Sequence, residues 1–177
     1  MKILKKIGIG LLGLILVICV VSLFFSTAVT IERSVTVNAP VASVFANVNQ
    51  MQNWGKWGGP WHEEGMDFNK VIQGYEGPAS GVGSTVIYNQ GDGNGTVKVI
   101  ESEPNKRIKT LITFAVGGSA NGEWKFEEMG NSTKVTWGLN VNLGYNPVKR
   151  IMGNLMFGGK VGPLFDKGLS NLKQVSE

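Results

Sequence analysis

Among its 177 residues the sequence has one cysteine and one histidine, and these shortages exclude several kinds of site. With Cys19 alone, no disulfide can form within the chain and no cysteine-based metal centre can be built. His62 stands beside Glu63 and Glu64, and one histidine with two adjacent carboxylates is poor geometry for a metal ligand set. The sequence therefore predicts no metal and no cofactor, and places His62 in an exposed loop.

Basic residues are also scarce outside the N-terminus. Three of the 17 Lys and Arg residues (Lys2, Lys5 and Lys6) lie in the first six positions, which leaves 14 against 13 acidic residues in the rest of the chain. A nucleic-acid-binding domain would instead gather an excess of basic residues on one face, so nucleic acid is excluded as a partner. No phosphate-binding loop, G-x-S-x-G motif or nucleophile–base pair is present either, and no catalytic residue is predicted.

One long apolar run is present near the N-terminus. From Ile7 to Phe25 there are 19 residues without a charge, and as a helix they would span roughly 28 Å, close to the ~30 Å hydrocarbon core of a bilayer. The lysines that precede the run favour a cytoplasmic N-terminus. Residues 1–28 are thus expected to be a single-pass membrane anchor that places residues 29–177 outside the cytoplasm. A signal peptide cleaved after Ala28 remains the alternative.

Alternation of apolar and polar residues dominates the remainder and predicts half-buried strands. The clearest case is 133–143, where Trp137 and Leu139 alternate with Thr136 and Gly138. Seven strands are expected, at 30–38, 67–76, 83–90, 95–103, 107–116, 121–129 and 133–143. Helical spacing predicts short helices at 41–48 and 50–57, and a bent or two-piece helix after Pro147. These elements predict that residues 29–177 form a single α+β domain.

The order of elements and several short motifs resemble the polyketide cyclase/dehydrase-type members of the START-like, Bet v 1-like (SRPBCC) superfamily. The motifs are Glu32 to Pro40, Val44-Phe45, Trp54 to Trp57, Pro60-Trp61, Gly77-Pro78, Gly81 to Gly83, Glu101 to Pro104, Lys134 to Trp137 and Gly162 to Lys173. The resemblance implies a helix-grip fold, in which a seven-stranded antiparallel sheet curls around the C-terminal helix and encloses a cavity for an apolar ligand. It does not fix a function, because this superfamily includes lipid carriers, cyclases, hormone receptors and chaperone co-activators.

Aromatic residues on the inward positions are the candidate ligand-binding residues. They are Trp57, Trp61, Tyr88, Phe114, Trp124, Trp137, Phe157 and Phe165. The entrance is expected near Trp57 and Trp61, and glycines of the C-terminal helix are expected to leave volume unfilled. These features predict a membrane-tethered binder of an apolar small molecule or lipid. A cyclase/dehydratase-type enzyme and an Hsp90-activator-like interaction domain are the alternatives, and simple core packing is the competing role for the aromatic residues.

Overall fold

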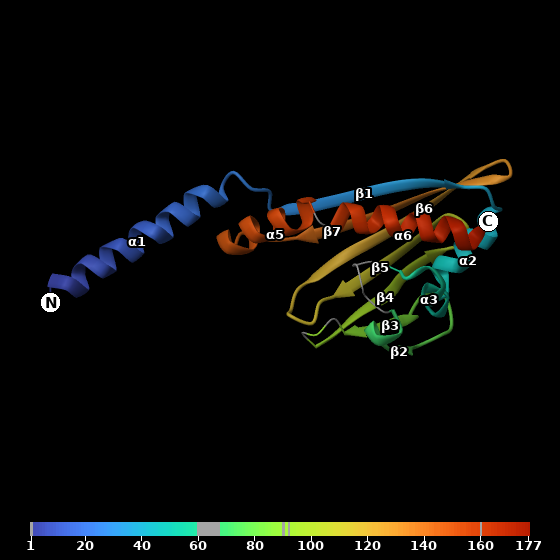
Figure 1. Ribbon diagram of the computed structural model, residues 1–177, viewed down its shortest axis with the longest axis horizontal. Coiled ribbons are helices and arrows are strands. Elements are labelled where there is room, and N and C mark those ends of the chain that lie inside the picture. The colour runs from blue at the N-terminus through green and yellow to red at the C-terminus, as the bar shows by residue number, and fades with distance from the viewer. Residues whose placement is uncertain (1, 60–67, 90, 92, 160) are drawn as a thin grey trace.

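The computed structural model describes residues 2–59, 68–89, 91, 93–159 and 161–177. An N-terminal helix projects from one α+β domain (Figure 1). The helices are α1 (Lys2–Ser22), α2 (Val41–Asn49), the 3₁₀ turn η1 (Met51–Asn53), α3 (Trp54–Trp57), α4 (Phe68–Val71), α5 (Pro147–Gly159) and α6 (Val161–Ser176). The strands are β1 (Ala28–Val37), β2 (Ile72–Glu76), β3 (Thr85–Asn89), β4 (Asn94–Glu103), β5 (Arg107–Thr113), β6 (Ser119–Met129) and β7 (Ser132–Asn142).

All seven strands form one antiparallel sheet in the order β1-β7-β6-β5-β4-β3-β2. From β2 to β7 each strand pairs with the next along the chain, and β1 completes the order by pairing with β7. The sheet curves around α6, which packs chiefly along β1 (Figure 1). This is the helix-grip arrangement, and the fold predicted from the sequence is confirmed.

The two ends of the sheet are distinct. Ala28 pairs with Asn142, Val141 pairs with Ala120, and Ala120 pairs with Ile112, so these residues share one end. This end, from which α1 leaves, is called the anchor end below. The opposite end, called the far end, carries the β6–β7 turn at Gly130, and α2 and α3 lie near it (Figure 1).

The buried core lies between the concave face of the sheet and the helices. On β7 the side chains of Val135, Trp137 and Leu139 are buried in this core, while Thr136 and Gly138 face outward. Alternation places every second residue on one face of a strand, which is why the pattern in the sequence located the core correctly. Every residue of the core lies after residue 28.

Helix α1 packs little against the domain. Its segment Ile3–Ser22 has a mean hydropathy of 2.4 and is long enough to cross a membrane. Most of its large apolar side chains are exposed. Contact of these side chains with water would be unfavourable, whereas contact with lipid would not be. Among the residues that the structure describes there is therefore one candidate membrane span, near the N-terminus.

Two strands have different bounds from those predicted. The strand predicted at 67–76 begins only at Ile72, because a helical turn, α4, precedes it and the side-chain amide of Gln73 donates to the carbonyls of Lys70 and Val71. The strand predicted at 107–116 ends at Thr113. Beyond it, Gly117 and Gly118 adopt positive φ and Gly117 N donates to Phe114 O, which forms a turn.

Candidate functional site

One half of the concave face, beneath α6, is filled by stacked aromatic rings. Trp137 lies between Phe165 of α6, at a centroid distance of 3.7 Å, and Trp124 of β6, at 4.3 Å. Trp57 meets both tryptophans edge to face, at 5.8 and 6.2 Å. All four side chains are buried. Four of the predicted site residues are thus brought together, and they form a packed wall.

The remaining described aromatic residues of the predicted site lie toward the anchor end. Phe114, just after β5, faces Phe157 of α5 at a centroid distance of 6.5 Å. Tyr88 of β3 is buried, and its hydroxyl donates to Thr113 O at 3.3 Å. Burial raises the pKa of the Tyr88 phenol, so the hydroxyl keeps its proton at neutral pH.

Burial of the core differs between the two ends of the sheet. At the far end Val37, Val44 and Val48 are completely buried. At the anchor end burial is mixed: Ala120, Val141 and Tyr88 are buried. Other apolar residues packed on the core there are only partly buried, and these include Val29, Ile112, Phe114 and Leu143. The anchor end of the concave face is called partly open in this sense, that some of its apolar side chains are partly exposed.

The burial of Trp57 does not fit an entrance beside it. Trp57 is buried, and its indole nitrogen donates to Asn47 O at 3.1 Å within the closed end. It belongs to the packed wall and not to a rim. Trp61, the other residue expected at the entrance, lies outside the described residues, as does His62. The partly open surface that the described residues provide is at the other end of the sheet, beside Phe114 and Phe157.

The glycines of the C-terminal helices do not leave the volume expected of them. A Cβ atom at Gly153 would collide with the side chain of Leu143, and one at Gly162 would collide with the guanidinium of Arg33. These glycines allow close packing of neighbouring side chains, so the expectation of empty space is wrong there. Gly159 is the exception, since nothing lies within 4 Å of a Cβ built on it, but it is exposed.

Small residues do shape the sheet wall. The ring of Tyr88 lies over Gly95, and the hydroxyl of Thr110 lies over Gly122, where in each case a Cβ would collide. Thr110 is buried on the concave face among isoleucines. Thr110 is not among the residues predicted for the site, although a threonine at an inward position between Ile108 and Ile112 indicates a polar group in the wall. It supplies a polar group to a wall that is otherwise apolar.

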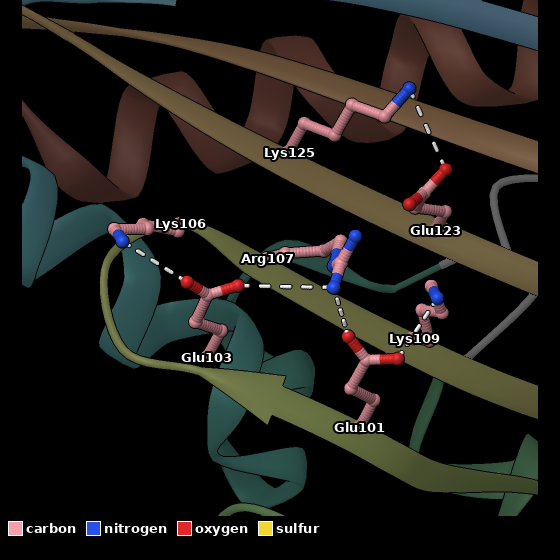
Figure 2. Close-up of polar contacts among 7 residues, drawn as sticks. All are labelled: Glu101, Glu103, Lys106, Arg107, Lys109, Glu123 and Lys125. Atoms are coloured by element: carbon pink, nitrogen blue, oxygen red, sulfur yellow. Dashed lines mark hydrogen bonds and ion pairs between the residues drawn. The ribbon is translucent and has the colours of Figure 1, made fainter.

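The outer face of the sheet carries a network of ion pairs (Figure 2). Glu101 contacts Arg107 and also Lys109, the latter at 2.9 Å, and Lys125 lies 3.5 Å from Glu123. A hydrogen bond from Lys109, aided by Arg107, lowers the pKa of Glu101. A hollow of about 200 Å³ lies beside this network, above Gly138. Because these charges are partly exposed and paired with one another, they form an ordinary solvated surface.

In the part of the chain that the structure describes, no group of three His, Cys, Asp or Glu side chains is placed to hold a metal ion. The polar groups of the concave face that the structure describes include the hydroxyls of Thr110 and Tyr88, both buried. Such groups suit hydrogen bonds that orient a bound molecule in an apolar pocket.

A curved antiparallel sheet gripping a C-terminal helix, with an apolar concave face, defines a helix-grip domain of the Bet v 1-like class. Residues 28–177 match the family described as "Polyketide cyclase / dehydrase and lipid transport", and the chain belongs to this family. No curated protein matches the sequence.

Solved structures share the fold at low sequence identity. The Aha1 dimer from Colwellia psychrerythraea is 18% identical, with a TM-score of 0.55 over 84% of this chain and 96% of that one. A protein from Chromobacterium violaceum is 15% identical, with a TM-score of 0.53 over 84% and 96%. One from Mycobacterium smegmatis is 13% identical, with a TM-score of 0.55 over 82% and 89%. These likenesses establish the fold alone.

Proposed function

We propose that the domain binds an apolar small molecule or a lipid on the concave face of its sheet, and that α1 holds it at a membrane. The family description, which names lipid transport beside cyclase and dehydrase activities, supports this class of ligand. The observation that carries the proposal is the partial exposure of apolar side chains at the anchor end. Val29, Ile112 and Phe114 leave an apolar surface partly open at the anchor end, beside the helix that would reach the lipid.

In this proposal the aromatic residues have two roles. Tyr88, Phe114 and Phe157 contact the ligand at the partly open end. The packed wall of the other aromatic residues limits how far a ligand penetrates; it consists of Trp57, Trp124, Trp137 and Phe165. Apolar walls with a few hydroxyls bind lipid-like molecules without charged partners.

Binding has more support than catalysis. A general acid or base works best when its pKa lies near the operating pH. Burial moves the pKa of Tyr88 the other way, above its ordinary value of 10.0. The hydroxyl of Thr110 is a hydrogen-bonding group and a very weak acid. These two groups can orient a ligand, and neither provides the proton transfer that a cyclase or dehydratase needs.

The test is binding of a fatty-acid-type fluorescent probe to residues 28–177, which contain the whole buried core. One saturable site is expected. Ile112→Trp puts a larger side chain on the concave face at the partly open end and should weaken binding about tenfold or more, since it occupies volume that the probe needs.

Leu111→Trp is the matched control, because Leu111 is the neighbouring residue on the outer face and is also partly buried. It should leave the probe affinity unchanged. If the wild-type domain takes up no probe, the core is solid and the proposal fails. If both variants weaken binding equally, the site lies elsewhere.

The side of the membrane is a separate part of the proposal. Lys2, Lys5 and Lys6 precede α1, which favours a cytoplasmic N-terminus and an extracytoplasmic domain. Protease should therefore digest the domain in right-side-out membrane vesicles and spare it in inverted ones. The reverse pattern would show the opposite orientation, and a mature chain beginning near Val29 would show that α1 is removed.

A further inference from the structure

Helix α5 exposes a row of large apolar side chains. Val148, Met152 and Leu155 follow one another at spacings of four and three residues, and they are 51%, 66% and 66% exposed. Such spacing places them on one side of the helix. The other side carries the buried residue Phe157, which packs on the core. A contiguous apolar row of this kind on a protein surface marks a site of interaction.

The same helix is fastened to the segment that leaves the candidate membrane span. The guanidinium of Arg150 donates to Phe25 O. The side-chain amide of Asn154 donates to Ser26 O at 2.8 Å and to Arg150 O at 2.8 Å. Phe25 and Ser26 belong to the short link between α1 and β1. These bonds hold α5 beside the point where α1 would emerge from lipid, and Figure 1 shows α5 at that end of the domain.

A further exposed apolar residue lies at the same end, on a different element. Val116, in the turn between β5 and β6, is 78% exposed. The flanking pair Thr113 and Ser119 sits next to Ile112 and Ala120, which belong to the anchor end. Helix α5 and this turn, which carry these exposed apolar residues, both lie at the anchor end (Figure 1).

The charge of this part of the chain suits a membrane surface. No Asp or Glu occurs between Glu128 and Asp166, whereas the exposed Lys149 lies in α5 next to Val148, and Arg150 lies at the linker. Basic residues beside an apolar helix face are attracted to anionic headgroups, and the combination is typical of helices that lie in the interface of a bilayer.

We infer that α5 and the β5–β6 turn dock on the bilayer as a second contact beside α1. The occupant is the lipid surface because the row adjoins the membrane helix and hydrogen bonds tie it to the linker. The inference rests on the membrane anchoring in the proposed function and deepens it. Docking would set the partly open end of the concave face, with Phe114 and Phe157, directly against the lipid from which an apolar ligand would come.

The test uses the full chain with Cys19→Ser, which removes the sole cysteine, and one new cysteine at a time carrying a polarity-sensitive fluorophore. The chain is reconstituted in vesicles of phosphatidylcholine and phosphatidylglycerol. At Met152→Cys the emission should shift to the blue and be quenched by lipids that carry a spin label. At Met129→Cys the emission should remain that of a label in water. Met129 is the matched control, a 54% exposed methionine at the far end of the sheet.

Leu155→Cys and Val116→Cys should behave like Met152→Cys if both elements dock. Water-like emission at Met152 and Leu155 would overturn the inference, and so would release of the chain by an alkaline wash, since α1 would then not be an anchor. Probe binding by residues 28–177 is measured without vesicles, so a failure of docking and a failure of ligand binding are told apart.

Discussion

The two faces of the sheet come from the same alternating strands, yet different forces hold them. On the concave face Trp137 is stacked between two other rings and is buried. On the outer face its neighbour Thr136 shares a hydrogen bond of 3.0 Å with Ser34, and ion pairs join partly exposed side chains. Apolar burial is the dominant favourable term in folding, whereas exposed ion pairs contribute little. Stability should therefore depend on the concave face far more than on the outer one.

The largest effect is expected from Trp137→Ala. The substitution removes the central ring of the packed wall and leaves a cavity between Trp124 and Phe165, which should lower the free energy of unfolding by about 3–5 kcal/mol. Urea denaturation of residues 28–177, followed by circular dichroism, measures the loss. The same variant should also raise the exposure of the neighbouring rings to an aqueous quencher.

Thr136→Ala, one residue earlier on the outer face, tests the contrast. Thr136 is itself buried, but the substitution removes only a hydroxyl, with its hydrogen bond to Ser34, and a methyl group, so the expected loss is roughly 1–2 kcal/mol. Equal losses for the two variants would mean that the faces of β7 are inverted or that the ring stack is absent.

Two glycines within strands, one on each face of the sheet, test the same difference between the faces. A Cβ at Gly95, on the concave face, would lie 2.7 Å from Thr113 O and collide with the Tyr88 ring. Gly95→Ala should therefore cost about 1–3 kcal/mol by overpacking. A Cβ at Gly138, on the outer face, would meet only Glu123 O and Ile31 O, each at 3.8 Å.

Gly138→Ala should accordingly change the unfolding free energy by less than about 0.5 kcal/mol. Urea denaturation of both variants provides the measurement. A Gly138 variant as unstable as the Gly95 variant would contradict the open outer surface above β7.

The fold was predictable because its main signal is local. Alternation over 133–143 and helical spacing after Pro147 each depend on residues close in sequence, and the resemblance then supplied the topology. Shorter features escaped prediction where a few hydrogen bonds outweighed periodicity. Examples are the helical turn before Ile72 and the register shift in β4 between Val99 and Glu101, which places Ser102 on the concave side, where it donates to Asn49.

The site was less predictable because it depends on contacts between distant segments. Aromatic residues at inward positions could be named, but the sequence does not say that Phe165 would stack on Trp137 or that Leu143 would fill the space at Gly153. The bonds from Arg150 and Asn154 to the linker cross more than a hundred residues. Nothing in the local pattern of α5 indicates them.

A small, pH-dependent effect is expected on the outer face, at Glu101. The hydrogen bond from Lys109, together with Arg107, holds the pKa of this carboxylate below its ordinary value of 4.5 in the folded chain. A lowered folded-state pKa stabilises the protein at pH values above the unfolded-state pKa, and the contribution disappears as the pH falls through the folded-state pKa. The wild type should therefore exceed Glu101→Gln in stability near neutral pH, and the difference should vanish in acid.

Urea denaturation of both chains across this pH range, at low and high salt, measures the difference. It should be smaller than the loss for Gly95→Ala, and high salt should reduce it, because the groups are partly exposed and mobile ions screen them. Glu128→Gln is the control, since this exposed residue makes no ion pair with any residue that the structure describes. A difference at Glu101 that grows as the pH falls, or that the Glu128 variant reproduces, would show that the Lys109–Glu101–Arg107 contacts do not stabilise the fold. The outer face would then contribute through its backbone pairing alone.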